Sequence, residues 1–320
     1  MTKYDDIVVG SGISGLTAAL LLAMAGRKIL LLEKAPRIGG SLARFTRQGV
    51  PFDTGFHFTG AFQKDGVLCD MLSVLGIRDA IQPIFLPRVG TNLFVFESDG
   101  QSMELPSGID NLRRKIRGYF PREAQGIDLY FDKVVSVCRR TSGMNLQDMS
   151  LSADVLDEDY ISAQSVLDEV TKDDRLQALL GGFCMCYGVK PSEISFANHS
   201  RICQGLYDSV ARVKDGGEAF IAAFMSRFKG LDVDIRTRTY IRECRDIRND
   251  QVGCFVLSDG EEVSARTCVL GIHPKETLKT LPAEHLSRAF VDRVSAFESS
   301  AGFFSVFGTV PRPGGQGFDP

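Results

Sequence analysis

The chain has 320 residues, of which 44% are hydrophobic and 24% are charged, and its formal net charge is -3. This length can bury a sizeable core and hold two domains, and the composition is that of a globular protein. A chain without a basic footprint is not expected to bind nucleic acid. No stretch nears the roughly twenty apolar residues that a transmembrane helix needs.

The eight cysteines give no sign of a metal site. Only Cys184 and Cys186 lie close together, and their Cys-x-Cys spacing differs from the Cys-x-x-Cys pairs of structural zinc sites. The first apolar strand begins near residue 5 with no secretory signal ahead of it. We therefore expect a cytoplasmic protein with reduced thiols.

The most informative stretch is residues 5–57. Residues 5–9 form a short apolar run that suits a buried parallel strand, and Gly10, Gly12 and Gly15 follow in the spacing G-x-G-x-x-G. In a dinucleotide-binding unit, the first glycine permits the tight turn and the second lets the backbone approach a pyrophosphate. The third lets the helix lie close to the strand. The phosphates would meet the free N–H groups at the start of that helix.

The next residues complete a βαβ unit. Residues 16–25 are predicted to form the helix, Gly26 its C-terminal cap, and residues 28–32 a second strand. Glu33 stands at the end of that strand, where a carboxylate accepts hydrogen bonds from a ribose and repels the 2′-phosphate of NADP. The unit predicts a dinucleotide site, and a glycine-rich turn that binds nothing is the alternative.

A second set of glycines follows at Gly39, Gly40 and Gly55. Bare backbone at these positions would permit close approach to a flat ring or a phosphate, whereas ordinary turns would explain each glycine singly. The segments Arg37-Ile38-Gly39-Gly40 and FDTGFHFTG, residues 52–60, resemble the FAD-dependent amine oxidase and phytoene desaturase superfamily. The second segment is most similar to the branch of carotenoid desaturases, carotenoid isomerases and retinol saturases.

That resemblance implies FAD as the cofactor. It also implies a cofactor site at Gly10, Ser11, Gly12, Ile13, Ser14, Gly15, Glu33, Lys34, Arg37, Gly39, Gly40, Ser41, Thr54, Gly55 and Ile241. Ile241 enters only through the backbone near Tyr240, which in the family contacts the adenine side of FAD.

Farther along, apolar spacing predicts helices at residues 64–76, 109–117, 121–137 and 173–180, and a hairpin within 92–106 that turns at Asp99-Gly100. Residues 141–159 suggest a loop, and Ser165 with Asp168 suggests a helix cap. Gly216-Gly217 introduces a helix. Short strands are expected at 233–235, 240–247, 253–257, 262–264 and 267–272, with turns at Asn249-Asp250 and Asp259-Gly260.

These elements predict an α/β protein with a Rossmann-like FAD-binding domain, made of a parallel sheet and a β-meander, plus an incomplete α+β substrate domain. The FAD-binding domain would be discontinuous, at residues 1–80 and 195–275, and the substrate domain would occupy 81–194 and 276–320. The resemblance implies that Phe183, Met185 and Tyr187 line an apolar cavity, although core packing explains these side chains equally well.

Of the four histidines, His57 is the candidate acid or base, because it lies in the segment beside the flavin and imidazole titrates near neutral pH. A structural histidine bonded to backbone is the alternative. His199 matches a family position without an assigned role, and His273 and His285 suggest a turn and a helix start. No catalytic triad, HExxH motif or glycosidase carboxylate pair is found, and flavin hydride chemistry requires none.

We therefore expect a FAD-dependent oxidoreductase that desaturates, saturates or isomerises an apolar conjugated isoprenoid. A non-catalytic or truncated FAD-binding protein and an NAD-dependent dehydrogenase are the alternatives. Peripheral membrane contact stays open, since enzymes that act on polyenes often meet them at a lipid surface. Family members continue past this length with a late Gly-Asp segment, whereas residues 300–310 only begin an expected strand. We therefore expect either a fragment or a shortened protein.

Overall fold

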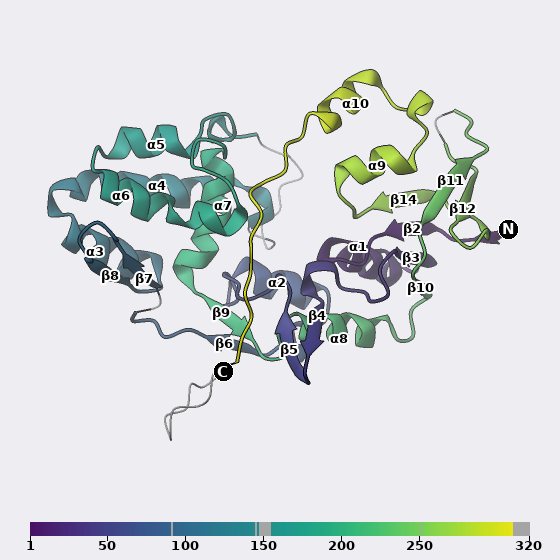
Figure 1. Cartoon of the computed structure of the whole chain (residues 1–320), viewed down its shortest axis with the longest axis horizontal. Helices are drawn as coiled ribbons and strands as arrows, with labels where there is room; N and C mark the ends of the chain where they lie inside the picture. The colour runs from purple at the N-terminus through teal and green to yellow at the C-terminus, as the bar shows by residue number, and fades with distance from the viewer. Residues whose placement is uncertain (91, 145, 147–154, 250, 310–320) are drawn as a thin grey trace.

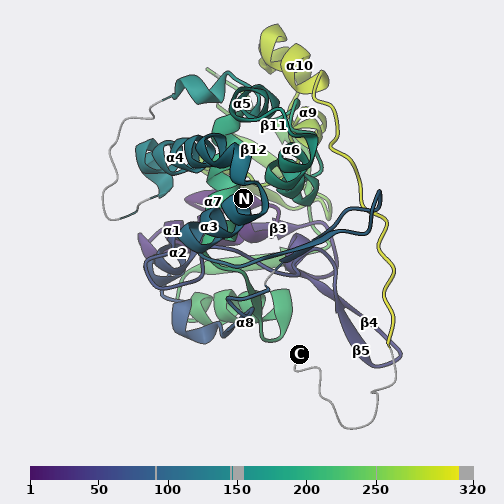
Figure 2. The same cartoon turned by 90° about the vertical axis from the view of Figure 1, so that its left-hand side faces the viewer.

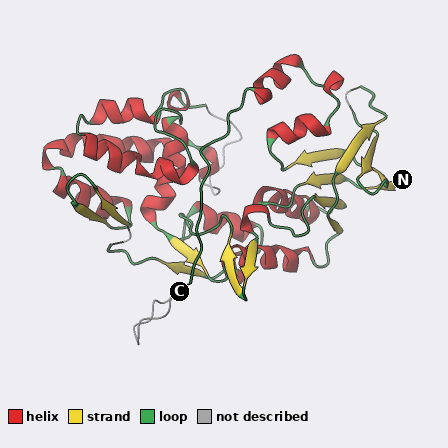
Figure 3. Ribbon diagram, in the orientation of Figure 1, coloured by secondary structure: helices red, strands yellow, loops and turns green. Residues whose placement is uncertain are grey.

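The computed structural model describes residues 1–90, 92–144, 146, 155–249 and 251–309. The helices α3 to α7 gather on one side of the molecule, which we call the helical half, and the strands β2, β3, β10 and β14 lie on the other, the sheet half (Figure 1). Coloured by secondary structure, the same view separates the helix-rich side from the side that carries the larger sheets (Figure 3). The predicted turn at Asn249-Asp250 and part of the predicted loop at 141–159 lie outside the described residues.

A parallel sheet forms the centre of the sheet half. Its order is β10 (Val233–Thr237), β3 (Ile29–Glu33), β2 (Asp6–Val9) and β14 (Thr267–Leu270), with every neighbouring pair parallel. Helix α1 (Ile13–Met24) connects β2 to β3. The predicted Rossmann-like architecture is therefore confirmed. The strands of this sheet come from two distant parts of the sequence.

The meander lies beside this sheet and is smaller than predicted. It consists of β11 (Ile241–Arg245), β12 (Cys254–Leu257) and β13 (Glu262–Ser264), and β1 (Thr2–Lys3) pairs parallel to β13. The predicted strand at 233–235 is not part of that run, because β10 instead pairs with β3 along its whole length.

A hairpin of β4 (Arg44–Arg47) and β5 (Val50–Asp53) is fixed to helix α8 (Gly216–Phe228). The Asp53 carboxylate accepts a hydrogen bond from the Gly217 N–H at 3.3 Å and pairs with Arg44 at 3.0 Å. At Gly217, an added β carbon would lie 2.0 Å from the Leu42 carbonyl oxygen. A glycine is therefore required where α8 crosses the segment after Gly40.

The helical half is built on α3 (Ile109–Tyr119), α4 (Ala124–Arg140), α5 (Ala163–Val170), α6 (Asp174–Gly181) and α7 (Phe196–Asp208). The hairpin β7 (Asn92–Val95) and β8 (Ser102–Leu105) covers one end, and its turn lies at the predicted Asp99-Gly100. The predicted cap at Ser165 is wrong. Ser162 has the extended backbone of an N-cap, and its hydroxyl accepts from the Ser165 N–H.

Two antiparallel strands, β6 (Pro83–Phe85) and β9 (Ala211–Val213), connect the halves, and α2 (Val67–Val74) lies beside them. Helix α7 packs against α4, and its residues Phe196, Cys203 and Tyr207 belong to the helical core. The chain returns to the sheet half through β9, after α7. The residue bounds of the two domains stay a prediction.

After α9 (Pro274–Thr280) and α10 (Arg288–Ser295), the chain runs between the two halves (Figure 1). The strand predicted from residue 300 is wrong for the described part of that segment, because residues 301–309 pair with no strand. A backbone hydrogen bond from the Ala301 N–H to the Gly188 carbonyl, at 2.9 Å, joins this segment to the helical half. Farther on, Phe307 packs on Phe45 and Phe52 of the β4–β5 hairpin, beside which the segment runs in Figure 2.

His199 lies at the centre of a buried polar network in the helical half. Its Nε2 is 2.8 Å from the Tyr130 hydroxyl, and its Nδ1 is 2.6 Å from the Tyr187 hydroxyl. Tyr130 is in turn 2.9 Å from the Tyr207 hydroxyl, and Tyr187 donates to Cys184 at 3.3 Å. These bonds hold the 3-10 segment η6 (Gly182–Tyr187) against α4 and α7.

Burial keeps every member of this network neutral. It lowers the pKa of His199 to about 4 and raises the pKa of the Cys203 thiol to about 12. Burial also raises the pKa of the Tyr130, Tyr187 and Tyr207 hydroxyls. Since each group is uncharged near neutral pH, the network can be satisfied by hydrogen bonds alone.

We expect His199→Gln to change the pH dependence of stability. The unfolded chain, with a histidine pKa of about 6.5, binds more protons than the folded chain as pH falls from about 6.5 toward 4. The wild type should therefore lose roughly 3 kcal/mol relative to the variant between pH 7 and pH 4. Denaturant unfolding at several pH values measures this difference. His285→Gln, at an exposed histidine, serves as control. Parallel profiles of unfolding free energy against pH for the wild type and His199→Gln would contradict the prediction.

Candidate functional site

The loop between β2 and α1 presents bare backbone to open space. Gly10 has a φ of +92°, which favours glycine, and an added β carbon on Gly15 would lie 1.9 Å from the Gly10 carbonyl oxygen. An added β carbon on Gly12, by contrast, would meet no atom within 4 Å. No side chain caps the first turn of α1, so its N–H groups stay free for an anion. The three glycines thus differ in the way that their spacing predicts.

The second glycine segment lies directly against this loop. The Gly39 N–H donates to the carbonyl and hydroxyl oxygens of Ser11, at 3.0 and 3.2 Å. A β carbon on Gly40 would be 3.0 Å from the Gly12 Cα, and one on Gly55 would be 3.2 Å from the Ser41 Cβ. Three segments that are separate in the sequence therefore form one continuous backbone surface.

Glu33 is fixed at the edge of that surface. Its carboxylate accepts hydrogen bonds from the Ser11 N–H at 3.0 Å, the Ser11 hydroxyl at 2.5 Å and the Ala35 N–H at 2.7 Å. A carboxylate has about four acceptor positions, so one remains for a ligand. A cleft of about 290 Å³ opens beside it, lined by Glu33, Lys34, Tyr240 and Ile241 among others.

The other predicted cofactor residues lie around the same surface. Ile13 and Ser14 form the first turn of α1 with exposed side chains, and Arg37 is exposed with no ion pair to any described residue. Exposed side chains also belong to Lys34, Ser41 and Thr54. The cofactor roles of all these residues stay predictions.

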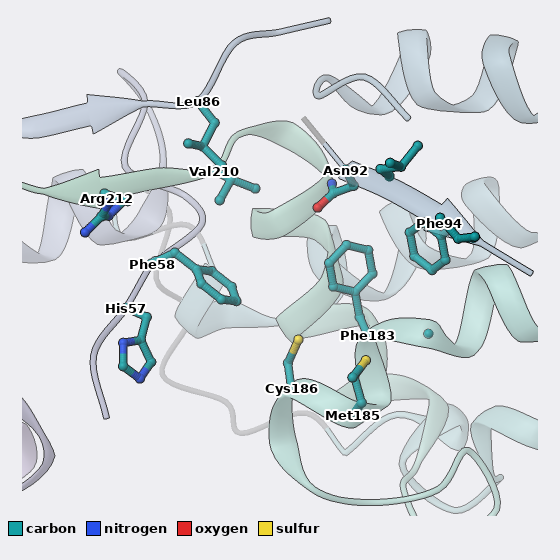
Figure 4. Close-up of a pocket in the computed structure, with 13 residues that line it drawn as sticks. His57, Phe58, Leu86, Asn92, Phe94, Phe183, Met185, Cys186, Val210 and Arg212 are labelled. Carbon is teal, nitrogen blue, oxygen red and sulfur yellow. The ribbon is translucent and has the colours of Figure 1, made fainter. Parts of the chain in front are cut away.

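Two adjoining cavities, of about 680 and 690 Å³, separate residues 54–61 from the helical half. They share His57, Phe58, Met185 and Cys186, and Figure 4 shows the first of them. Each is lined mainly by apolar side chains, and its volume falls within the usual range for small-molecule sites, about 300–1,000 Å³. Thr54 and Gly55 line the second cavity, so the predicted flavin segment continues into its wall.

The structure brings the predicted cavity residues together. Phe183, Met185 and Tyr187 all line one or both cavities, and Phe183 also packs on Tyr207. His57 is exposed and forms no hydrogen bond with a described residue, so its predicted acid or base role remains a prediction.

Several lining residues lie outside the sequence predictions, namely Phe58, Asn92, Phe94, Arg212 and Phe303. Arg212 stands between two apolar residues of a short strand, and that alternation is a signal that its side chain points away from the core. Phe303 is far from the others in sequence and carries no such signal.

Within the described residues, no helix is long and apolar enough to cross a bilayer, and no group of three or more His, Cys, Asp or Glu side chains could hold a metal ion.

A model of the NAD(P)-binding Rossmann-like domain matches residues 8–74. The all-trans-retinol 13,14-reductase of Rattus norvegicus is 30% identical over 229 residues, which are 64% of this chain and 37% of the relative. Prolycopene isomerase 1 of an Oncidium hybrid is 31% identical over 148 residues, 46% of this chain and 25% of the relative. The chain thus spans well under half the length of both curated relatives.

Among solved structures, putrescine oxidase bound to putrescine superimposes with a TM-score of 0.64 at 18% identity, over 92% of this chain and 63% of that one. This likeness concerns the fold alone. By sequence the chain is similar to part of a retinol 13,14-reductase and part of a prolycopene isomerase, and by fold it is similar to putrescine oxidase.

Proposed function

We propose that this chain binds FAD and contributes to an oxidoreductase that acts on an apolar conjugated isoprenoid of the retinoid or carotenoid type. The observation that carries the proposal is the continuity of the backbone surface at Gly12, Gly40 and Gly55 with an apolar cavity. Because the chain spans only part of its relatives' length, the activity of the whole protein is part of the proposal.

Each part of the surface has a role in this proposal. The free N–H groups of α1 and the bare backbone at Gly12 and Gly40 would hold the pyrophosphate, and Glu33 would accept a hydrogen bond from the ribose. The cleft beside Ile241 would take the adenine. The fit is supported by the open space at Gly12, since a loop that bound nothing would not need that space.

When bound, the flavin would supply hydride transfer. The protein would position the substrate against it and exclude water from the cavity. The apolar side chains Phe58, Phe183 and Met185 would hold a flat polyene and exclude water from it. The neutral network around His199 would keep the cavity wall at Gly182–Tyr187 in place. Desaturation, saturation and isomerisation all use such a cavity. Peripheral membrane contact and a cytoplasmic location stay predictions.

Flavin binding provides the first test. We expect the purified chain, incubated with FAD and desalted, to be yellow and to bind FAD more tightly than FMN, because FMN lacks the adenosine half that Glu33 and the adjacent cleft would contact. A preference for NAD would favour the dehydrogenase alternative, and a colourless protein would contradict the proposal. If FAD binds but no retinoid or carotenoid changes its redox state, the non-catalytic alternative holds.

Two glycine substitutions should separate folding from cofactor binding. Gly12→Val introduces a side chain into open space, so thermal stability should be preserved while FAD binding is lost. Gly15→Ala places a carbon 1.9 Å from the Gly10 carbonyl oxygen, and overpacking of this kind should cost about 3 kcal/mol of unfolding free energy. Thermal melts and FAD titrations measure both effects. Normal FAD affinity in Gly12→Val would remove this position from the phosphate site.

Glu33→Ala should weaken FAD binding by ~1.5–3 kcal/mol, the worth of a hydrogen bond to a charged group. This corresponds to an affinity loss of about 10- to 150-fold in a FAD titration. Glu284→Ala, at an exposed glutamate far along the chain, is the matched control. Unchanged affinity in Glu33→Ala would exclude the ribose role.

A further inference from the structure

Among the described residues that line the first cavity, Arg212 is the only lysine or arginine. Arg212 lies on β9 between the buried Ala211 and Val213, and its side chain lines the cavity near Phe58. Figure 4 shows Arg212 and His57 on the same side of the cavity, with Phe94 on the opposite side. Among the described residues, none forms an ion pair or hydrogen bond with the Arg212 side chain.

Arg201 provides a comparison at the second cavity. Arg201 lines the second cavity, but its guanidinium is paired with the Asp159 carboxylate at 2.7 Å. No acidic side chain occurs among the described residues that line either cavity. The charge of Arg201 is therefore satisfied within the protein, whereas that of Arg212 is left to solvent or to a ligand.

The proposed function leaves two substrate classes open, pure hydrocarbons and polyenes with an oxygen head group. The Arg212 side chain is exposed, so its guanidinium is hydrated. A hydrocarbon that filled the first cavity would displace part of that water and offer no acceptor in its place, which is unfavourable for a charged group. A carboxylate would form two parallel charge-assisted hydrogen bonds with the planar guanidinium. The apolar tail could then lie toward Phe94 and Phe183.

We propose that the first cavity binds a polyene carboxylate and that Arg212 binds its head group. This inference rests on the proposed function. Arg212 is then the residue that determines specificity between an acidic polyene and a hydrocarbon of the same length. Asn92 and His57 are further polar groups of the same lining, and either can donate a hydrogen bond to a carboxylate oxygen.

The experiment compares three ligands of one carbon skeleton, retinoate, retinol and the corresponding hydrocarbon, on the full chain without flavin. The chain has no tryptophan, so polyene absorbance and fluorescence can be followed without interference from indole. We expect wild type to bind retinoate at least about tenfold more tightly than the hydrocarbon, and this preference should fall as salt is added.

Arg212→Gln should weaken retinoate binding about tenfold or more and leave hydrocarbon binding unchanged or improved, whereas Arg212→Lys should keep part of the preference. Arg88→Gln, which removes an exposed charge outside both cavities, is the matched control. Circular dichroism shows whether each variant is folded. If Arg212→Gln does not fold, the retinoate affinity of Arg212→Lys is compared with that of the wild type instead.

Equal binding of all three ligands by wild type, no polyene binding at all, or unchanged retinoate affinity in Arg212→Gln would overturn the inference. These outcomes are distinguishable from failure of the proposed function. Flavin binding with redox chemistry on the hydrocarbon alone would overturn only the head-group role. A chain that binds retinoate through Arg212 but takes up no flavin would overturn only the oxidoreductase proposal.

Discussion

Contact between backbone segments at glycine positions is the constraint on which the site depends. Helix α1 approaches β2 at Gly15, and α8 approaches the segment after Gly40 at Gly217. At Gly60, an added β carbon would lie 2.4 Å from the Gly205 carbonyl carbon, so the segment of residues 54–60 lies against helix α7 in the same way. Each contact is too close for a side chain, and together they fix the loop, the hairpin and the helical half relative to one another.

Polar side chains have different surroundings on the two sides of the first cavity. In the helical half, His199, Tyr130 and Tyr207 are buried and Tyr187 is half-buried, and these neutral side chains bond to one another, which holds the cavity wall without introducing charge. At the opposite wall, Arg212 keeps its charge and has no partner among the described residues. The polar groups of the network bond to one another, whereas the exposed Arg212 guanidinium can bond to a ligand. With the proposed head-group role, a mostly apolar cavity would still select its ligand.

The backbone surface at Gly12, Gly40 and Gly55 and the second cavity are contiguous through residues 54–60, a short segment that belongs to both. Its near end follows the β4–β5 hairpin, which Asp53 fixes to α8, and its far end meets α7. The arrangement suits the proposed function, in which a flat cofactor and a flat substrate would be held face to face with water excluded. The curated relatives are named as a retinol reductase and a prolycopene isomerase, and the proposed function extends that likeness to this chain.

The sequence alone determined the βαβ unit, the separate roles of Gly12 and Gly15, and the resemblance carried by residues 37–40 and 52–60. Those features depend on local sequence spacing, because in a turn or a helix the spacing of residues determines where their side chains lie. The prediction of a cap at Ser165 was wrong because a serine two or three residues away can cap the helix equally well. The prediction of a strand after residue 300 was wrong because a strand needs a partner strand. Only the tertiary structure decided that β10 and β14 complete the parallel sheet, that His199 is buried among tyrosines, and that Arg212 faces an apolar cavity. These depend on contacts between residues far apart in the chain, for which local spacing carries no information.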